Sequence, residues 1–294
     1  LLNLKFKKYS PISKFPTVNR ELNFLIDTKI DFSSIQKLIM KILLSNDDGY
    51  DAPGLKILYE TLKNFAELFV VAPEINNSGA GCSITTNKPM HVTEHSNGFL
   101  SVTGTPADCV YLGIHELAPW HPDLVISGIN LGANMGEDLL YSGTVGAALE
   151  ARGLAYPSIA ISAAAFHQPG SLAYMEPNYK ISANVVLDLL QNYNLQKIDS
   201  SLVLNINTPN VVLLDDLTYK VTSVGSWGSR NPPQVQKAEN GQLTYWTSHR
   251  DVYSKNGQNT DINALEENMV SISPISPNFT VDKVKDKTFS LDKK

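Results

Sequence analysis

Apolar runs alternate with amphipathic segments along the first two thirds of the chain. Runs of consecutive apolar residues are typical of strands buried on both faces of a parallel sheet, and they occur at residues 42–44, 68–73, 123–128 and 157–162. Apolar residues at helical spacing predict helices over 55–62, 144–152 and 184–190. This alternation predicts an α/β fold: a Rossmann-like three-layer core with a mostly parallel sheet and helices on both of its faces.

The pattern changes after about residue 208. Asn240-Gly241 lies between two strand-like segments, which predicts a tight hairpin, and residues 269–274 alternate with period two. We therefore predict an α/β core over 40–208. Over 209–294 we predict extended β-hairpins that form an oligomerisation arm, ending in a solvated tail from Val281 onward.

Residues 1–39 differ from the rest of the chain. They mix lysines with prolines and lack the compact apolar stretch of a secretory signal. Met40 stands directly ahead of the first apolar run and would make a natural translation start. We interpret 1–39 as an N-terminal extension that is either disordered or an artefact of a misplaced start. A real N-terminal arm is the alternative.

Composition narrows the classes of function. The chain is 43% hydrophobic and 18% charged, and its formal net charge of -5 argues against a nucleic-acid scaffold with a basic surface. No apolar stretch reaches the roughly 18 residues needed to span a bilayer, so we expect no membrane partner. Cys82 and Cys109 suggest neither a disulfide framework nor a zinc site. We expect a cytoplasmic protein.

The first apolar run ends in two adjacent carboxylates, Asp47 and Asp48, followed by Gly49. Ligands of open α/β sheets bind just beyond the carboxyl ends of the strands. Two adjacent carboxylates repel each other and are costly to bury unless a bound cation or a proton neutralises part of their charge. A divalent ion that prefers oxygen ligands is the cation best suited to do so. The alternative is an ordinary Asp-Asp-Gly turn on the surface.

Three further polar loops could reach the same place. Residues 72–85 follow the second predicted strand and include Ser78, which could supply a neutral metal ligand. Residues 127–136 follow the third strand and are either a ligand-binding loop or a glycine-rich turn. Residues 142–144 open a helix whose free amides suit a phosphate, unless Ser142 or Thr144 only caps that helix. Since these loops follow core strands, we expect them to converge on one crevice.

Five short motifs follow one another in a distinctive order. They are Ser45-Asn46-Asp47-Asp48-Gly49, Ala72-Pro73-Glu74 with Ser78-Gly79, Thr103-Gly104-Thr105-Pro106-Ala107-Asp108, Ser127-Gly128-Ile129-Asn130 and Ser142-Gly143-Thr144. This set resembles the SurE family of survival-protein nucleotidases. The resemblance covers Met40 to about Pro274, and no motif position departs from the pattern.

The resemblance implies a hydrolase, a metal-dependent phosphomonoesterase or 5′-nucleotidase that acts on nucleoside 5′- and 3′-monophosphates. It also implies one Mg²⁺ or Mn²⁺ ion per subunit, and homodimers or homotetramers that exchange C-terminal arms. Carried over by position, the metal ligands would be Asp47, Asp48, Ser78 and Asn130. The phosphate pocket would be lined by Asn46, Gly79, Asn134, Ser142, Gly143 and Thr144.

The chemistry of the acidic pair agrees with a phosphatase. A divalent ion on two carboxylates and neutral oxygens keeps positions open for water and a phosphate oxygen. Of the catalytic pair Asp47 and Asp48, Asp47 is the candidate reactive carboxylate, as nucleophile or as general base. A dinucleotide oxidoreductase would carry Gly-x-Gly-x-x-Gly where this chain has the acids. A non-catalytic nucleotide-binding or assembly protein of the same fold would have lost an acid or the 142–144 loop.

Overall fold

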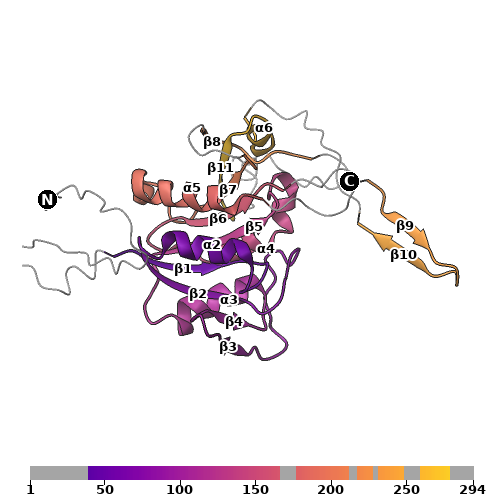
Figure 1. Cartoon of the computed structure of the whole chain (residues 1–294), viewed down its shortest axis with the longest axis horizontal. Coiled ribbons are helices and arrows are strands. Elements are labelled where there is room, and N and C mark those ends of the chain that lie inside the picture. The colour runs from indigo at the N-terminus through magenta and orange to yellow at the C-terminus, as the bar shows by residue number, and fades with distance from the viewer. Residues whose placement is uncertain (1–38, 166–176, 212–216, 228–230, 248–258, 279–294) are drawn as a thin grey trace, which may run out of the picture. The chain divides into compact units, whose positions relative to one another are not determined.

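The structure is a computed structural model that describes residues 39–165, 177–211, 217–227, 231–247 and 259–278 (Figure 1). The chain divides by contacts into Leu1–Leu38 and Ile39–Lys294, and every described residue belongs to the second unit. The predicted N-terminal extension, apart from Ile39, and the predicted tail from Val281 lie outside the described residues.

A nine-stranded sheet forms the centre of this unit, in the order β3-β4-β2-β1-β5-β6-β7-β11-β8. Its strands are β1 Lys41–Ser45, β2 Glu67–Pro73, β3 Val92–Glu94, β4 Leu100–Val102, β5 Leu124–Leu131, β6 Ser158–Ala163, β7 Val203–Thr208, β8 Tyr219–Val221 and β11 Val270–Ile275. From β4 to β7 all neighbours are parallel, whereas β3 and β11 run antiparallel to β4 and β7. The predicted α/β fold with a mostly parallel sheet is therefore confirmed.

Helices cover both faces of the sheet (Figure 1). They are α2 Pro53–Leu62, α3 Pro106–Leu112, α4 Gly143–Glu150, α5 Tyr179–Asn192 and α6 Asp261–Glu266, with short turns η1 Gly113–Leu117, η2 Gly136–Leu140 and η3 Leu195–Lys197. Alternate residues of each strand point to opposite faces. Leu44 accordingly joins the core under α2 and α5, while Leu43 joins the core under α3 and α4. Each such fully buried side chain contributes about 1.5–3 kcal/mol relative to exposure.

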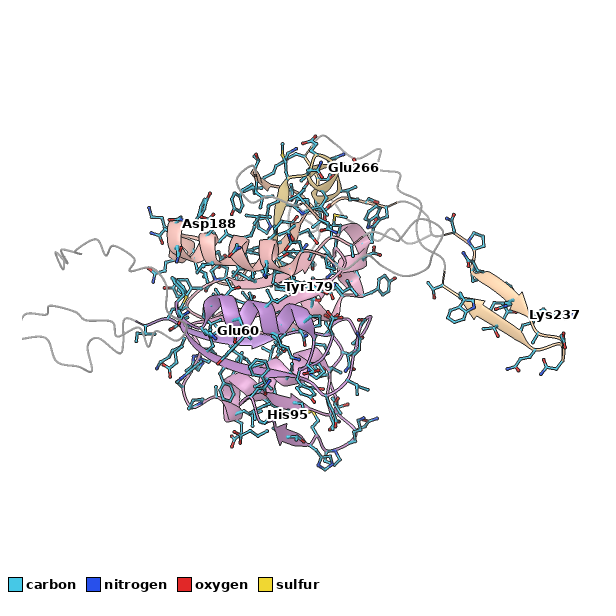
Figure 2. The ribbon with its side chains drawn as sticks, viewed as in Figure 1. Glu60, His95, Tyr179, Asp188, Lys237 and Glu266 are labelled. Atoms are coloured by element: carbon cyan, nitrogen blue, oxygen red, sulfur yellow. The ribbon has the colours of Figure 1, made fainter. Side chains whose placement is uncertain are left out.

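Close packing between α2 and α5 depends on a small residue. Tyr179, labelled in Figure 2 at the start of α5, lies beside Gly54 of α2, where a Cβ atom would come within 3.2 Å of the ring. The same Cβ atom would lie 2.1 Å from the carbonyl oxygen of Ile129 in β5, so only glycine fits here. None of the helices that the structure describes is long and apolar enough to cross a membrane.

Strand β5 is longer than the sequence predicts. The prediction ended it at Gly128 and placed residues 127–136 in a loop, but β5 continues to Leu131. After an irregularity in the register, Asn130 and Leu131 pair with Ser162 and Ala163 of β6. A Cβ atom at Gly128 would lie 2.3 Å from the carbonyl oxygen of Ile161, so this glycine permits close approach of the strands instead of ending one.

The predicted hairpin around Asn240-Gly241 is confirmed. Strands β9 Gln234–Lys237 and β10 Leu243–Trp246 form a separate two-stranded antiparallel sheet, and Gly241 has a positive φ of 82° in its turn. Lys237 is labelled in this hairpin in Figure 2. Residues 270–275 do not form the second extended arm that was predicted. As β11 they pair with β7 inside the large sheet, where Val270, Ser271 and Ser273 are buried. Strand pairing thus continues across residue 208.

Candidate functional site

The candidate site lies where the strand order of the sheet reverses. Strand β1 sits between β2 and β5: the chain runs from β1 to β2 on one side and later crosses to β5 on the other side. Such a switch point opens a crevice at the carboxyl ends of the strands, where ligands of open α/β sheets bind. Asp47 and Asp48 follow β1 directly, and the other candidates follow β2, extend β5 or open α4.

Asp47 is almost fully buried and is held from α4. Its side chain is 3% exposed, and the hydroxyl of Thr144 donates a hydrogen bond of 2.6 Å to its Oδ1. A Cβ atom at Gly143 would lie 2.8 Å from the Asp47 side chain, so glycine lets the first turn of α4 reach the carboxylate. Burial raises the pKa of Asp47, and hydrogen bonds from Thr144 and from the amides of this turn oppose that rise.

The hydroxyl groups of the 142–144 segment are engaged within the protein. Ser142 caps α4 by accepting a hydrogen bond of 3.1 Å from the amide of Val145. Thr144, which is fully buried, donates to Asp47. The segment therefore places the first amides of α4 and the Thr144 hydroxyl against the Asp47 carboxyl group and orients it. A direct role of these two hydroxyls in binding phosphate stays a prediction.

Asp48 is more open and joins two other parts of the site. It accepts hydrogen bonds of 3.3 Å from the side chain of Asn76, in the loop after β2, and from the amide of Leu131, at the end of β5. Burial and then the charge of Asp47 raise the pKa of Asp48 to about 6. The ion pairs among the described residues join other side chains, so no described base neutralises this acidic pair.

The side chains around the pair suit a hard divalent cation. Among the residues that the structure describes, no group of three histidine, cysteine or acidic side chains could hold a metal. A metal here would therefore need neutral oxygens beside the two carboxylates. The side-chain nitrogen of Asn130 donates a hydrogen bond of 2.8 Å to the carbonyl oxygen of Gly132. The side-chain oxygen of Asn130 accepts no bond in this contact and is the atom that could bind a metal. Ser78 is exposed on the loop after β2, where its own amide donates to Asn76.

Asn46 and Gly79, both predicted for the phosphate pocket, have different surroundings. Asn46 is fully buried, and its carboxamide bonds both the amide and the carbonyl oxygen of Gly49. Asn46 thereby stabilises the turn that contains Asp47 and Asp48. Gly49 adopts a φ of 108° in this turn, which favours glycine. Gly79 lies on the exposed loop, with no atom within 4 Å of a Cβ position.

Asn134 is fixed by a buried polar network that the sequence reasoning missed. Its amide donates to the Asn207 side chain at 2.8 Å, and its carbonyl oxygen accepts from Asn205 and Asn207 at 2.9 Å. Its own side chain donates to Ser162 at 2.9 Å. Asn205 and Asn207 stand at alternate positions of a fully buried strand, β7. Buried polar side chains need hydrogen-bond partners, so two asparagines in an apolar strand were the sequence signal for a buried polar network.

The structure thus brings most of the candidates together beyond the carboxyl end of β1. Asp47, Asp48, Asn130, Gly143 and Thr144 meet at the switch point. The loop carrying Ser78 and Gly79 reaches the acids through its neighbours, since Asn76 bonds the Asp48 side chain and the amide of Asn77 donates to the Asp47 carbonyl oxygen at 2.7 Å. Fold and site together define a doubly wound α/β protein with an acidic centre at its switch point.

The chain belongs to the SurE family: the family profile described as Survival protein SurE matches residues 42–231. A 5′-nucleotidase SurE of Methylococcus capsulatus is 39% identical over 241 residues, or 82% of this chain and 93% of the relative. A 5′-nucleotidase SurE of Pseudomonas savastanoi pv. phaseolicola is 41% identical over 236 residues, or 80% and 92%. The crystal structure of SurE protein from Aquifex aeolicus matches with a TM-score of 0.69 at 35% identity, covering 84% of this chain and 97% of that one.

Proposed function

We propose that this chain is a 5′-nucleotidase, a phosphatase that releases inorganic phosphate from nucleoside monophosphates. The observation that carries the proposal is the pair of the buried Asp47 and the half-buried Asp48 at the switch point, without a basic partner among the described residues. Relatives of 39% and 41% identity that bear the name 5′-nucleotidase SurE support the same reaction. A non-catalytic binding protein is disfavoured, because both acids and the 142–144 segment are present.

A divalent ion completes this proposal. Asp47, Asp48, Ser78 and Asn130 would hold one Mg²⁺ or Mn²⁺ ion per subunit. When bound, such an ion supplies Lewis-acid stabilisation of charge on the phosphoryl oxygens. The donor set supports the proposal, because two carboxylates with neutral oxygens are ligands that these hard cations prefer.

The protein groups have separable tasks in the proposed reaction. The Thr144 hydroxyl and the amides at the start of α4 hold the Asp47 carboxyl group in one orientation and oppose the rise of its pKa that burial causes. Asp47 is the reactive group, as nucleophile or as general base for the attacking water. Trapping separates these roles: borohydride reduction of acid-quenched enzyme labels Asp47 only if an aspartyl phosphate forms there.

The β9–β10 hairpin supports the proposal that subunits associate as homodimers or homotetramers. Four large apolar side chains on it are about half exposed or more: Val235, Leu243, Tyr245 and Trp246. Exposed apolar groups gathered on one element commonly mark an interface. Light scattering on a Tyr245→Lys variant tests this, since a lower mass than that of the wild type is expected. The cytoplasmic location stays a prediction.

The function is tested by phosphate release from a panel of nucleoside 5′- and 3′-monophosphates. The enzyme is first treated with EDTA and then supplied with Mg²⁺ or Mn²⁺. Release that disappears with EDTA and returns with the metal is the expected result. A folded protein that releases no phosphate with any metal would contradict the proposal.

A further inference from the structure

The segment that separates Asn134 from Ser142 is fastened by residues far away in the chain. This segment, residues 135–141, contains the short helical turn η2 and runs between two parts of the proposed phosphate pocket. Leu139 is buried in a small apolar cluster with Val145 and Ala148, whereas Leu140 and Tyr141 are 62% and 48% exposed. One apolar side chain leaves the rest of the segment to be positioned by its polar contacts.

Trp227 makes the first of these contacts. Its indole N–H donates a hydrogen bond of 2.8 Å to the carbonyl oxygen of Met135, and its amide donates one of 2.7 Å to Glu137. The hydroxyl of Ser226 donates to the other oxygen of Glu137. The indole ring also lies against Gly136, whose φ of 55° suits glycine and where a Cβ atom would come within 2.7 Å of the ring.

Asp261 makes the second contact, from the start of α6. Its Oδ2 accepts a hydrogen bond of 3.0 Å from the amide of Gly136, and its Oδ1 accepts bonds from the amides of Gly225 at 2.7 Å and Ile262 at 2.9 Å. The carboxylate is completely buried. It therefore ties the segment that carries Trp227 to the same glycine that the indole ring covers. A buried carboxylate with three amide donors makes a strong, geometrically defined anchor.

We propose that Trp227, Glu137 and Asp261 form a clamp that sets the position of residues 135–141, the segment between Asn134 and Ser142, and with it the binding of the substrate phosphate. The inference rests on the proposed function. None of the three residues is placed on the reacting atoms, so they act as positioning residues. The acids that would hold the metal are anchored elsewhere, by β1, α4 and Asn76. Loosening the clamp should therefore weaken phosphate binding and leave metal binding intact.

Trp227→Phe is the discriminating variant. Phenylalanine keeps an aromatic ring against Gly136 but removes the hydrogen bond to Met135. The chain offers a matched control in Trp120→Phe, which removes a hydrogen bond of the same kind, 2.7 Å from the indole N–H to Glu67, where β2 begins at the opposite end of the sheet. Wild type and both variants are compared for KM, kcat, inhibition by inorganic phosphate and Mn²⁺ affinity by calorimetry.

For Trp227→Phe we expect KM and the inhibition constant of inorganic phosphate to rise together, by about three- to tenfold, the usual net effect of one hydrogen bond. Mn²⁺ affinity and kcat should stay within about twofold of the wild type, as should every constant of Trp120→Phe. Asp261→Asn replaces an acceptor oxygen with a donor and should have a larger effect in the same direction. The clamp would be overturned if Trp227→Phe and Trp120→Phe had equal inhibition constants for inorganic phosphate. It would also be overturned if Trp227→Phe lost Mn²⁺ affinity to the same extent as phosphate affinity.

Hydrogen exchange separates failure of the clamp from failure of the proposed function. The clamp requires faster amide exchange in peptides covering 134–143 in Trp227→Phe than in Trp120→Phe, whether or not the protein is a phosphatase. Unchanged exchange would refute the clamp even in an active enzyme. An inactive wild type with the expected exchange difference would refute only the nucleotidase.

Discussion

The two sides of the acidic site are built differently. On the inner side, Asp47 is 3% exposed and is fixed by the fully buried Thr144 and by the first turn of α4. On the outer side, Ser78 and Gly79 lie on an exposed loop, and Gly79 has no neighbour within 4 Å of a Cβ position. Asp48 stands between them, half-buried and held by two hydrogen bonds of 3.3 Å.

The difference indicates which half of the site is organised before a ligand arrives. A reactive group must keep the same orientation through every catalytic cycle, and burial with short hydrogen bonds maintains that orientation. An entry side must admit metal and substrate, and an exposed loop with few contacts can adjust around them. Changes on the inner side should therefore affect the chemical step, whereas changes on the outer side should affect ligand affinity.

The largest effect is expected from Asp47→Asn on the inner side. The substitution keeps the shape of the side chain but removes half of the anionic charge of the pair, so kcat should fall by about 10³-fold or more. Thermal melting should stay near the wild-type value, because the variant no longer buries a charge. The control is Asp51→Asn, an exposed acid nearby that pairs with Lys56. A metal-dependent Asp47→Asn enzyme of normal activity would refute the assignment of the site.

Thr144→Val should have the next largest effect. Valine has nearly the same shape but cannot donate to the buried Asp47 carboxylate, so kcat should fall by about 10- to 100-fold through loss of orientation. The unpaired buried oxygen should also destabilise the fold by about 1–3 kcal/mol, measured by chemical denaturation. Thr144→Ser keeps the hydroxyl and should retain most of both properties. If the valine and serine variants behave alike, the hydroxyl does not orient Asp47.

The dependence of metal affinity on pH tests the middle of the site. The raised pKa of Asp48, about 6, means that its carboxyl is ionised above that pH and protonated below it. If Asp48 is a ligand, as proposed, protons compete with the metal for it, so Mn²⁺ affinity should be constant above about pH 7 and fall about tenfold for each unit below pH 6. Calorimetric titrations of the metal-free protein at several pH values measure this. An affinity that does not change between pH 5 and 7 would show that Asp48 is not a ligand.

The smallest effect is expected from Ser78→Ala on the outer side. Loss of one neutral oxygen should weaken Mn²⁺ binding by about tenfold, while kcat at saturating metal and the melting temperature stay near their wild-type values. Ser83→Ala, which removes another exposed hydroxyl from the same loop, serves as the control. A large loss of kcat with unchanged metal affinity would contradict the assignment of the outer side to ligand binding.

Much of the inner side could be predicted from local sequence. The apolar run before Asp47 and Asp48 predicts a strand, and the rule for parallel sheets places its end at the crevice. The hairpin could be predicted because Asn240-Gly241 favours one turn type. In the loop after β2, Ser78 and Gly79 could be proposed only from motif order, because nothing in their local pattern requires a ligand.

The contacts that complete the site could not be predicted in this way. Thr144 and Asp47 are 97 positions apart, and Gly136 and Asp261 are 125 apart. Such pairs depend on strand order and on the packing of loops, which hydrophobic periodicity does not encode. The end of β5 was misplaced for a related reason. Gly128 has the character of a turn, and only pairing with β6 reveals its role in a strand.

The place of β11 in the sheet has a consequence for synthesis of the chain. Strand β11 lies between β7 and β8 and pairs with β7 over residues 271–275. On the ribosome, β7 emerges well before β11, so the nascent protein carries an unpaired strand edge beside the buried Asn205 and Asn207. Open edges of this kind invite pairing with other chains. Premature termination between β7 and β11 should therefore yield an aggregating fragment, not a smaller enzyme.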